Sequence, residues 1–339
     1  MRALYLLPIR RDHRPADCEL IAYVRWVATV MPVVVVDGSP AEIFAAHASA
    51  WGDIARHLPV DADVRTLNGK VAGVLTGLRR VADQAVVIAD DDVRYDADSL
   101  ADVVRALVTA HVVRPQNYFA PLPWHARWDT GRILINRALD GDWPGTLAVR
   151  GSVMRATGGY AGDVLFENLE LVRTVVAAGG TQRLAREILV RRLPPRSNHF
   201  WGQRVRQAYD EFARPWRLVA QLAVLPVLVL LALTGGVPAL VGCAAVIISL
   251  AEFGRRRDGG RRVFPFRASL LAPAWVLERA ITSWLALATR VLHGGVRYAG
   301  TRVARAATPM RELERRHAGA VSAAPASAVP PSAPRRRSA

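Results

Sequence analysis

A long apolar stretch in the second half of the sequence places the strongest constraint on the fold. Leu218–Leu233 is almost wholly apolar, Thr-Gly-Gly at 234–236 interrupts it, and apolar residues resume over Val237–Phe253. Each limb has about 17 residues, near the minimum for a helix that crosses the hydrocarbon core of a bilayer. The sequence therefore predicts a transmembrane helical hairpin over 216–254. The alternative is a buried helical hairpin in a soluble core.

Arginines flank both outer ends of this hairpin. Arg214 and Arg217 precede the first limb, five arginines follow the second limb within 255–262, and the turn carries no charge. Cytoplasmic loops of membrane proteins carry an excess of Lys and Arg, so both ends are expected in the cytoplasm. These features predict a multi-pass protein of the cell membrane, with 1–215 and 255–339 on the cytoplasmic side.

The segments after the hairpin differ in composition. Residues 255–317 are predicted to form a basic loop and interfacial helices, because 268–292 is apolar but carries Glu278 and two arginines. A third membrane span is the alternative there. The last residues, 318–339, consist mainly of Ala, Pro, Ser and Arg and are expected to be disordered.

The first 215 residues alternate between short apolar runs and helical patterns. The runs at 3–7, 32–36 and 85–89 are continuous and rich in Val, Ile and Leu, as strands buried on both faces are. Helical stripes lie between and after them, one over 71–78 and another that begins at Asp98-Ser99. Strand and helix in alternation predict an α/β domain over 1–215, with a mixed, mostly parallel sheet and helices on both faces.

Two of the predicted strands end in acidic residues. One run ends at Asp37, and the other ends at three consecutive carboxylates, Asp90, Asp91 and Asp92. Ligands of open α/β sheets bind beyond the carboxyl ends of the strands. Carboxylates there suit Mg²⁺ or Mn²⁺ with phosphate oxygens as co-ligands, and the cation would relieve the repulsion within the triplet. The alternative is an acidic turn that caps the next helix.

Three further patterns suggest an anionic ligand or acid–base chemistry. Lys70 lies at the start of a helix, where a cation and free N–H groups favour an anion. Glu167 and Glu170 are one turn apart on a later helix and share a face. On a third helix, the guanidinium of Arg206 is flanked by the amides of Gln203 and Gln207, and such a group suits phosphate oxygens. Ordinary solvated helix faces are the alternative for all three patterns.

In this order, the motifs resemble those of family 2 glycosyltransferases, which have the GT-A type, nucleotide-diphospho-sugar transferase fold. The resemblance covers about residues 1–215 and extends to membrane-anchored members similar to ceramide and bacterial lipid glucosyltransferases. It rests on the segments "LLPIRRD", "VVVVDGSP", "GKVAGVLTGL", "ADDDV" and "QRVRQ". The last of these resembles Q-x-x-R-W, with Gln207 in the place of the usual Trp.

The resemblance implies roles for individual residues. It implies a uridine-diphospho-sugar as the donor and Mg²⁺ or Mn²⁺ as the cofactor. Asp90 and Asp92 would hold the metal. The donor would be contacted by Pro8, Arg10, Asp37, Lys70, Asp90, Asp91, Gln203, Arg206 and Gln207.

One position departs from the family pattern. The family's catalytic base is an Asp in an E-D triplet, whereas the matching stretch here is "LFENLEL", with Asn168 at that position. An amide cannot accept a proton at any useful pH. A neighbouring carboxylate, from Glu167, Glu170 or Asp163, is therefore the candidate base.

The sequence thus predicts a membrane-anchored inverting glycosyltransferase that transfers a sugar to a lipid or lipid-linked glycan hydroxyl. The alternative is a non-catalytic nucleotide-sugar-binding membrane protein, which Asn168 favours. The net charge of +16 also raises nucleic-acid binding. The basic residues, however, concentrate beside the apolar limbs and in the C-terminal tail, where anionic lipid accounts for them, so no nucleic-acid partner is predicted.

Overall fold

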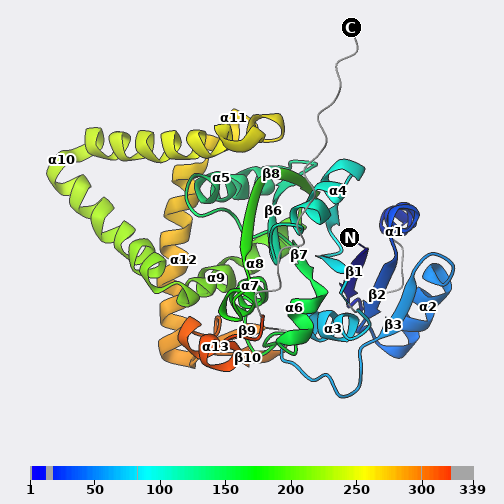
Figure 1. Cartoon of the computed structure of the whole chain (residues 1–339). Helices are drawn as coiled ribbons and strands as arrows, with labels where there is room; N and C mark the ends of the chain where they lie inside the picture. Colours follow the sequence, from blue (N-terminus) through cyan, green and yellow to red (C-terminus); the bar gives the residue numbers. More distant parts are fainter. Residues whose placement is uncertain (1, 13–17, 82, 299, 322–339) are drawn as a thin grey trace, which may run out of the picture.

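The computed structural model describes residues 2–12, 18–81, 83–298 and 300–321 (Figure 1). Most of the tail predicted to be disordered, 318–339, lies outside the described residues. The described part contains an eight-stranded sheet of order β3-β2-β1-β4-β7-β6-β8-β5. Its strands are β1 (Ala3–Ile9), β2 (Val33–Asp37), β3 (Arg56–Pro59), β4 (Ala85–Ala89), β5 (Val93–Arg94), β6 (Val112–Phe119), β7 (Thr146–Arg150) and β8 (Gln182–Arg192).

The sheet is mixed, with a parallel half at one end. Strands β3, β2, β1 and β4 are parallel to one another, and β6 is parallel to β8. Strand β7 is antiparallel to both β4 and β6, and the short β5 is antiparallel to β8. The three strands expected at 3–7, 32–36 and 85–89 are β1, β2 and β4, so this part of the prediction is confirmed.

Helices cover both faces of the sheet. Within 1–215 these are α1 (Cys18–Val30), α2 (Ala41–Trp51), α3 (Gly69–Leu78), α4 (Ala97–Ala106), α5 (Trp124–Ala138), α6 (Gly151–Ala156), α7 (Glu167–Ala177), α8 (Ser197–Gly202) and α9 (Arg204–Tyr209), with a 3₁₀ turn η1 (Asp210–Ala213). Helix α4 begins at Ala97, slightly before the expected Asp98-Ser99, because the N-cap is Asp96, which accepts a hydrogen bond from the Ser99 N–H at 2.8 Å.

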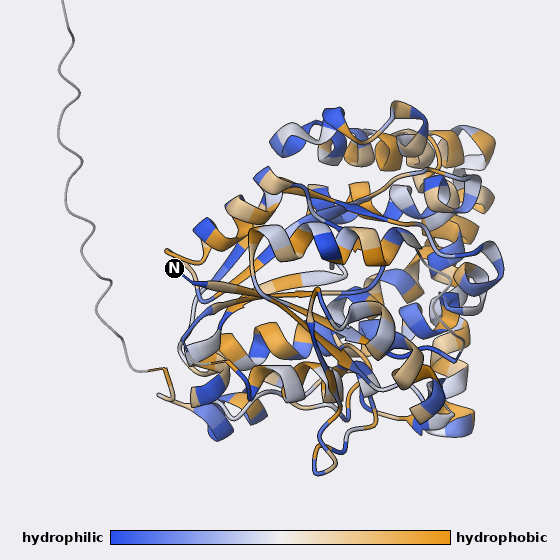
Figure 2. Ribbon diagram, turned by 90° about the vertical axis from the view of Figure 1, so that its right-hand side faces the viewer, coloured by the Kyte–Doolittle hydropathy of each residue, from blue (hydrophilic) through white to orange (hydrophobic). Residues whose placement is uncertain are grey.

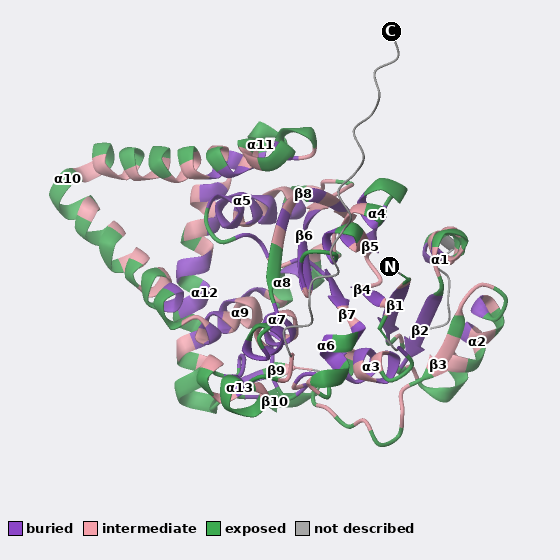
Figure 3. Ribbon diagram, viewed as in Figure 1, coloured by how far each residue is buried: buried purple, intermediate pink, exposed green. Residues whose placement is uncertain are grey.

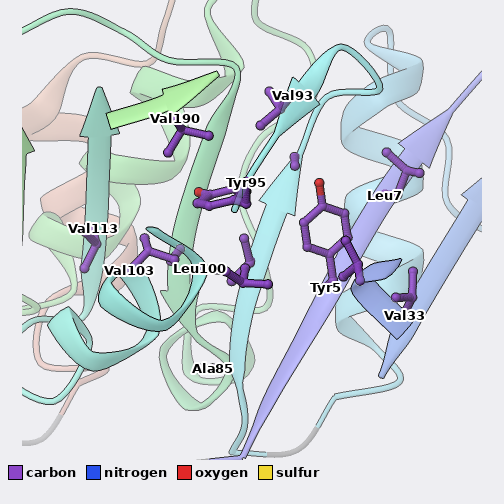
Figure 4. Close-up of a cluster of buried hydrophobic side chains, with 14 of the residues drawn as sticks. Tyr5, Leu7, Val33, Ala85, Val93, Tyr95, Leu100, Val103, Val113 and Val190 are labelled. Atoms are coloured by element: carbon purple, nitrogen blue, oxygen red, sulfur yellow. The ribbon is translucent and has the colours of Figure 1, made fainter. Parts of the chain in front are cut away.

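The core lies on both sides of the central strands, because their alternate residues point to opposite faces. On β1, Tyr5 and Leu7 join a cluster that includes α1 and α4 residues, whereas Leu4 and Leu6 join one that includes α3 and α7 residues. Figure 4 shows part of the first cluster, and Figure 2 shows the central strands coloured largely as hydrophobic. Strands buried on both faces explain the continuous apolar runs in the sequence.

The apolar stretch forms a bent helix, α10 (Pro215–Arg256), whose two limbs diverge from a bend and project away from the sheet (Figure 1). The bend lies at Gly236, with φ 57° and ψ −154°, a conformation that residues with a Cβ rarely adopt. Most of α10 is exposed or half-buried (Figure 3). By length and composition, the segments Pro215–Arg262 and Phe266–His293 are long and apolar enough to cross a membrane.

The chain after α10 returns to the sheet domain. It continues through η2 (Arg257–Arg262), α11 (Phe266–Ser269), α12 (Ala272–His293), the hairpin β9 (Val296–Tyr298) and β10 (Thr301–Val303), and α13 (Met310–His317). Helix α12 packs against α5, α9 and α10. Residues after β10 reach α7, where the N–H groups of Leu165 and Phe166 donate to the carbonyls of Arg305 and Ala306. This return could not be predicted from local sequence patterns, because it rests on contacts between distant segments.

Candidate active site

A polar cavity of about 390 Å³ lies where the carboxyl end of β4 meets α3, α7, α9 and α12. Seven of its lining side chains are cationic and four are acidic. The cations are Lys70, Arg132, Arg192, Arg206, Arg214, Arg217 and Arg279, and the acids are Asp90, Glu167, Asp210 and Glu211. The wall also contains aromatic rings and amides, which belong to Trp143, Phe166, Asn168, Gln207, Trp275 and Tyr298. The excess of cations suits an anionic ligand.

Lys70 joins two of the predicted acidic residues at the mouth of β4. Its Nζ atom lies 2.6 Å from Oδ1 of Asp90 and 3.0 Å from Oε1 of Glu167. The side chain of Asn68 caps α3 by accepting from the backbone N–H of Lys70, which sets this residue at the first turn. Burial alone would lower the pKa of Lys70, but the two carboxylates outweigh it and raise that pKa. The ammonium is therefore permanently charged.

Each carboxylate of the acidic triplet has a cationic partner. Arg192, at the end of β8, donates from Nε to Asp92 at 2.9 Å and from Nη2 to Asp90 at 3.3 Å. Asp91 instead points to Arg11, at 2.8 Å. Burial raises the pKa of Asp92 above its usual value, although Arg192 opposes this and Asp90 adds to it. Three adjacent carboxylates can thus end a buried strand because three cations meet them.

Gly145 makes room for this cluster. A Cβ at this position would lie 2.7 Å from Oδ2 of Asp90 and 2.9 Å from Cζ of Arg192, closer than real Cβ contacts. The Gly145 N–H donates to Asn117 at 2.7 Å, and its carbonyl accepts from the backbone N–H of Asp90 at 2.8 Å. A larger residue here would push the Asp90 and Arg192 side-chain ends out of their present positions.

The acidic cluster has part of a ligand set for a divalent cation. Within the described residues no group of three His, Cys, Asp or Glu side chains could hold a metal by itself. Oδ1 of Asp92 is buried and has no hydrogen-bond partner, next to the carboxylate of Asp90. Two carboxylates completed by phosphate oxygens are the donor set that Mg²⁺ and Mn²⁺ take at nucleotide sites. The residues therefore fit a metal that arrives with a phosphate ligand.

The predicted donor residues near β1 and β2 lie outside the cavity wall. Pro8 is buried within β1, and Arg10 is exposed just after it. The carboxylate of Asp37 is buried and faces inward, with Oδ2 at 2.6 Å from His47 and 3.1 Å from His57. Burial alone would raise the pKa of Asp37, but hydrogen bonds from His57, Ser39 and His47 hold it well below its usual range. Both carboxylate oxygens of Asp37 thus have protein partners, and its contact with a nucleoside stays a prediction.

The predicted amide–guanidinium face is divided between two short helices. Arg206 and Gln207 line the cavity, whereas Gln203 lies between α8 and α9 and accepts a hydrogen bond from Arg206. Gln207 accepts from Arg204 at 2.8 Å. The Arg206 guanidinium also lies 5.6 Å from the ring centre of Tyr298, a residue of β9. Arg206 is thus held in place and faces the cavity.

The three candidate bases and Asn168 have different positions. Glu167 and Asn168 line the cavity, and Asn168 donates from Nδ2 to the Pro144 carbonyl at 2.8 Å. Asp163 is exposed and accepts from the Leu67 N–H at 3.2 Å. Glu170 is fully buried, and Oε2 accepts from the Thr308 N–H at 2.7 Å. Glu170 thus ties α7 to the C-terminal segment, and Glu167 is the carboxylate of this stretch at the cavity.

Sequence reasoning missed Asp210, which follows α9 and lines the cavity. Its Oδ1 atom is buried without a hydrogen-bond partner. Burial raises the pKa of Asp210 to about 7; Arg206 opposes the shift and Glu167 adds to it. In the sequence, Asp210 lies three residues after Gln207 of the "QRVRQ" motif, and this spacing could have indicated a position near the same site. Tyr298 and Arg279 were missed because the return of the C-terminal segment brings them to the cavity.

Comparison with solved structures identifies the fold. The mannosyltransferase PcManGT from Pyrobaculum calidifontis, in complex with GDP-Man and Mn²⁺, matches with a TM-score of 0.50 and 21% identity, over 84% of this chain and 87% of that chain. TarS of S. aureus matches with a TM-score of 0.40 and 11% identity, over 60% of this chain and 38% of its own. Glucosyl-3-phosphoglycerate synthase of M. tuberculosis matches with a TM-score of 0.38 and 15% identity, over 58% and 73%.

The first of these likenesses covers most of both chains and shows that this chain has a glycosyltransferase-type fold. The other two are too weak to support a structural argument. No protein-family model matches the chain, and no match was found among curated proteins. Function therefore has to be argued from the cavity itself, because a shared fold does not imply a shared activity.

Proposed function

We propose that this protein is a membrane-anchored inverting glycosyltransferase that uses a nucleotide-diphospho-sugar. The observation that carries the proposal is the pairing of Lys70 and Arg192 with Asp90 at the carboxyl end of β4, inside a cation-rich cavity. In a fold of this type the strand ends form the ligand-binding edge. The likeness to a mannosyltransferase solved with GDP-Man and Mn²⁺ supports the same class of donor.

The donor's diphosphate is the natural ligand of the cations at this edge. Lys70, Arg192 and Arg206 would bind it, since charged N–H donors form strong hydrogen bonds with phosphate oxygens. Asp90 and Asp92 would hold Mg²⁺ or Mn²⁺, which neutralises charge on the diphosphate when bound. The same cations stabilise the negative charge that builds on the leaving diphosphate as the glycosidic bond breaks. The identity of the donor's nucleoside, predicted as uridine, stays a proposal.

A carboxylate has to take the proton of the acceptor hydroxyl as its oxygen attacks the anomeric carbon from the face opposite the diphosphate. Glu167 and Asp210 are the two acids that line the cavity near Arg206. Glu167 forms an ion pair with Lys70, which weakens it as a base. Asp210 has a free carboxylate oxygen and a pKa of about 7, which matches a general base at neutral pH. We therefore assign the proton transfer to Asp210 and a positioning role to Glu167.

The bent helix α10 supports a membrane location and a lipid or lipid-linked glycan acceptor. Its limbs have about 20 residues each, so each is about 30 Å long, enough to reach across the hydrocarbon core. The arginines around 255–262 would lie against anionic headgroups on the cytoplasmic side. The cavity is bounded by α12, which packs on α10, so an acceptor held in the membrane would be close to the donor.

A second candidate function is that of a non-catalytic nucleotide-sugar-binding membrane protein. Asn168 at the family's base position favours it. Hydrolysis of the donor in the absence of an acceptor separates the two candidates, because many transferases transfer slowly to water whereas a binding protein leaves the donor intact.

The test of the proposed function uses the full-length protein in neutral detergent with Mn²⁺ and a panel of UDP- and GDP-sugars. Release of nucleoside diphosphate, with a membrane lipid extract as the acceptor, is the measurement. The test variant is Asp90→Asn, which keeps the size of the side chain and removes the negative charge that pairs with Lys70 and Arg192. No release from any donor, or equal release by the variant, would refute the proposal.

A further inference from the structure

Arg279, on the face of α12 that lines the cavity, is a buried cation without a carboxylate partner in the described part of the chain. Its side chain is 3% exposed. Its Nε and Nη1 atoms are buried and make no hydrogen bond. Its guanidinium lies 5.5 Å from the ring centre of Trp275. Burial of a charged group without a partner strongly destabilises a fold, so such a group in a cavity wall suggests a missing anion.

Most other arginines of the cavity wall already form ion pairs with acids. Arg192 pairs with Asp90 and Asp92, and Arg132 pairs with Asp129 and Asp142. On the side of α10, the partners of Arg214 and Arg217 are Glu211 and Asp140. Apart from Arg206, which is assigned to the donor, Arg279 is therefore the cavity arginine that forms no ion pair within the described residues.

The position of Arg279 separates it from the donor edge. The donor cations come from α3, β8 and α9, whereas Arg279 comes from the helix that contacts α10. Near Arg279 on α12, Ser283 donates to Gln221 at 2.9 Å and the Trp284 indole donates to the Leu222 carbonyl at 3.1 Å. Trp284 also borders an apolar groove with residues of α10, namely Leu225, Pro226, Val229, Leu230 and Leu233. Helix α12 thus connects a buried cation to an apolar surface, about 7.5 Å further along the helix axis.

We propose that Arg279 binds a phosphate group of the lipid acceptor, with the apolar chain of the lipid against α10. The acceptor class is therefore a phosphate-bearing lipid, and a neutral sphingolipid or diacylglycerol would lack the required anion. This inference rests on the proposed function. Asp210 lies within electrostatic reach of both Arg206 and Arg279. A phosphate at Arg279 would thus hold the acceptor beside the proposed base.

The test measures binding to the full-length protein in neutral detergent by calorimetry. The probes are dihexanoyl phosphatidic acid, dihexanoylglycerol as its neutral counterpart, and inorganic phosphate. Dihexanoyl phosphatidic acid should bind the wild-type protein, and Arg279→Met should weaken this binding roughly 30-fold or more, as loss of one partner of a buried charge pair does. Dihexanoylglycerol should not bind measurably. Weaker binding of inorganic phosphate, lost in the same variant, is expected because it supplies the anion without the chain.

The matched control is Arg267→Met, which removes an exposed arginine from the neighbouring α11. It should leave the binding of dihexanoyl phosphatidic acid unchanged. Titration with UDP or GDP and Mn²⁺ gives the second arm. Arg279→Met should leave nucleotide affinity within about twofold of wild type, since no donor cation is removed. Reduced nucleotide affinity with unchanged phosphatidic acid binding would assign Arg279 to the donor and overturn the proposal.

Thermal unfolding guards against a folding defect. Because an unpaired buried charge is removed, Arg279→Met should melt no lower than wild type without ligand, while phosphate should raise the melting temperature of wild type alone. If Arg279→Met does not fold, Arg279→Lys keeps the charge but loses the planar fork, and it should bind phosphatidic acid more weakly than wild type. Equal binding by Arg279→Lys and wild type would then refute the assignment. Arg279-dependent binding without any sugar transfer would refute the proposed function and leave this site standing.

Discussion

Replacing Asp210 with asparagine should stabilise the protein in a pH-dependent way. Burial raises the pKa of this carboxyl in the folded state from 3.8 to about 7, and each unit corresponds to about 1.4 kcal/mol. The pKa of Asp210 is higher in the folded state than in the unfolded state. The protonated carboxyl therefore contributes its full stability below about pH 4, and this contribution is lost as the pH rises to about 7. The shift of roughly three units sets an upper limit of about 4 kcal/mol on this loss.

Asp210→Asn keeps the shape of the protonated carboxyl but cannot ionise. The variant should therefore match wild type near pH 4 and exceed it in melting temperature at pH 8, with the difference opening between about pH 4 and 7. Thermal unfolding of both proteins in the same detergent, at intervals from pH 4 to 8, measures this. Asp163→Asn is the control, because it makes the same substitution at an exposed carboxyl that does not line the cavity. Parallel pH profiles for Asp210→Asn and wild type would refute the reasoning.

The same variant also tests the chemistry. A general base contributes about 10²–10⁴-fold to turnover, so Asp210→Asn should reduce kcat by that factor with little effect on donor affinity. In the wild-type protein, kcat should rise with pH through about 7, as the carboxyl loses its proton. Full activity in Asp210→Asn would move the proton transfer to Glu167.

Three other outcomes are expected. Asp92→Asn should abolish the Mn²⁺ dependence of donor binding measured by calorimetry, because it removes a candidate ligand; unchanged dependence would count against the metal assignment. Glu167→Gln should reduce kcat, whereas Glu170→Gln should mainly lower the melting temperature, since Glu170 accepts a buried hydrogen bond outside the cavity; the reverse pattern would contradict the placement of the two acids. In a cysteine-free background, a cysteine at Gly235 should react with an impermeant maleimide in intact cells and one at Ser197 should not; labelling at 197 would overturn the cytoplasmic location.

Much of the sheet domain could be predicted because its signals are local. The apolar runs of β1, β2 and β4 and the period of α3 are each legible within ten residues, and the rules for open sheets place Asp90 at the ligand edge. Sequence patterns could predict that Lys70, Asp90 and Glu167 lie at that edge. They could not predict that Lys70 contacts both carboxylates. Their geometry depends on Gly145 and Arg192, whose roles come from antiparallel strands that periodicity did not reveal.

Other parts of the site depend on contacts between distant segments. Asp37 ends its strand as expected, but His47 and His57 reach its carboxylate from α2 and β3, and no motif around Asp37 foretells that. The wall formed by Tyr298 and Arg279 exists because the chain returns after α10 and packs on α7 and α9. Sequence patterns report what a segment does with itself or with solvent, and they carry little information on which distant segment will cover it.

The arrangement of the cavity gives a physical reason for the position of the bent helix. The cations proposed to bind the donor lie on elements of the sheet domain, and Arg279 lies on α12, which packs against both α5 and α10. Charges on one side of the cavity are largely neutralised by Asp90, Asp92 and Glu167. Arg279 forms no ion pair among the described residues, although Glu278, Glu211 and Asp210 lie within its electrostatic reach. Most cations at the donor edge of the cavity are thus paired with acids, whereas Arg279 in the α12 wall has no ion-pair partner in the described part of the chain. An acceptor that brings its own negative charge from the membrane would complete that wall, which couples occupation of the cavity to the substrate that α10 is positioned to receive.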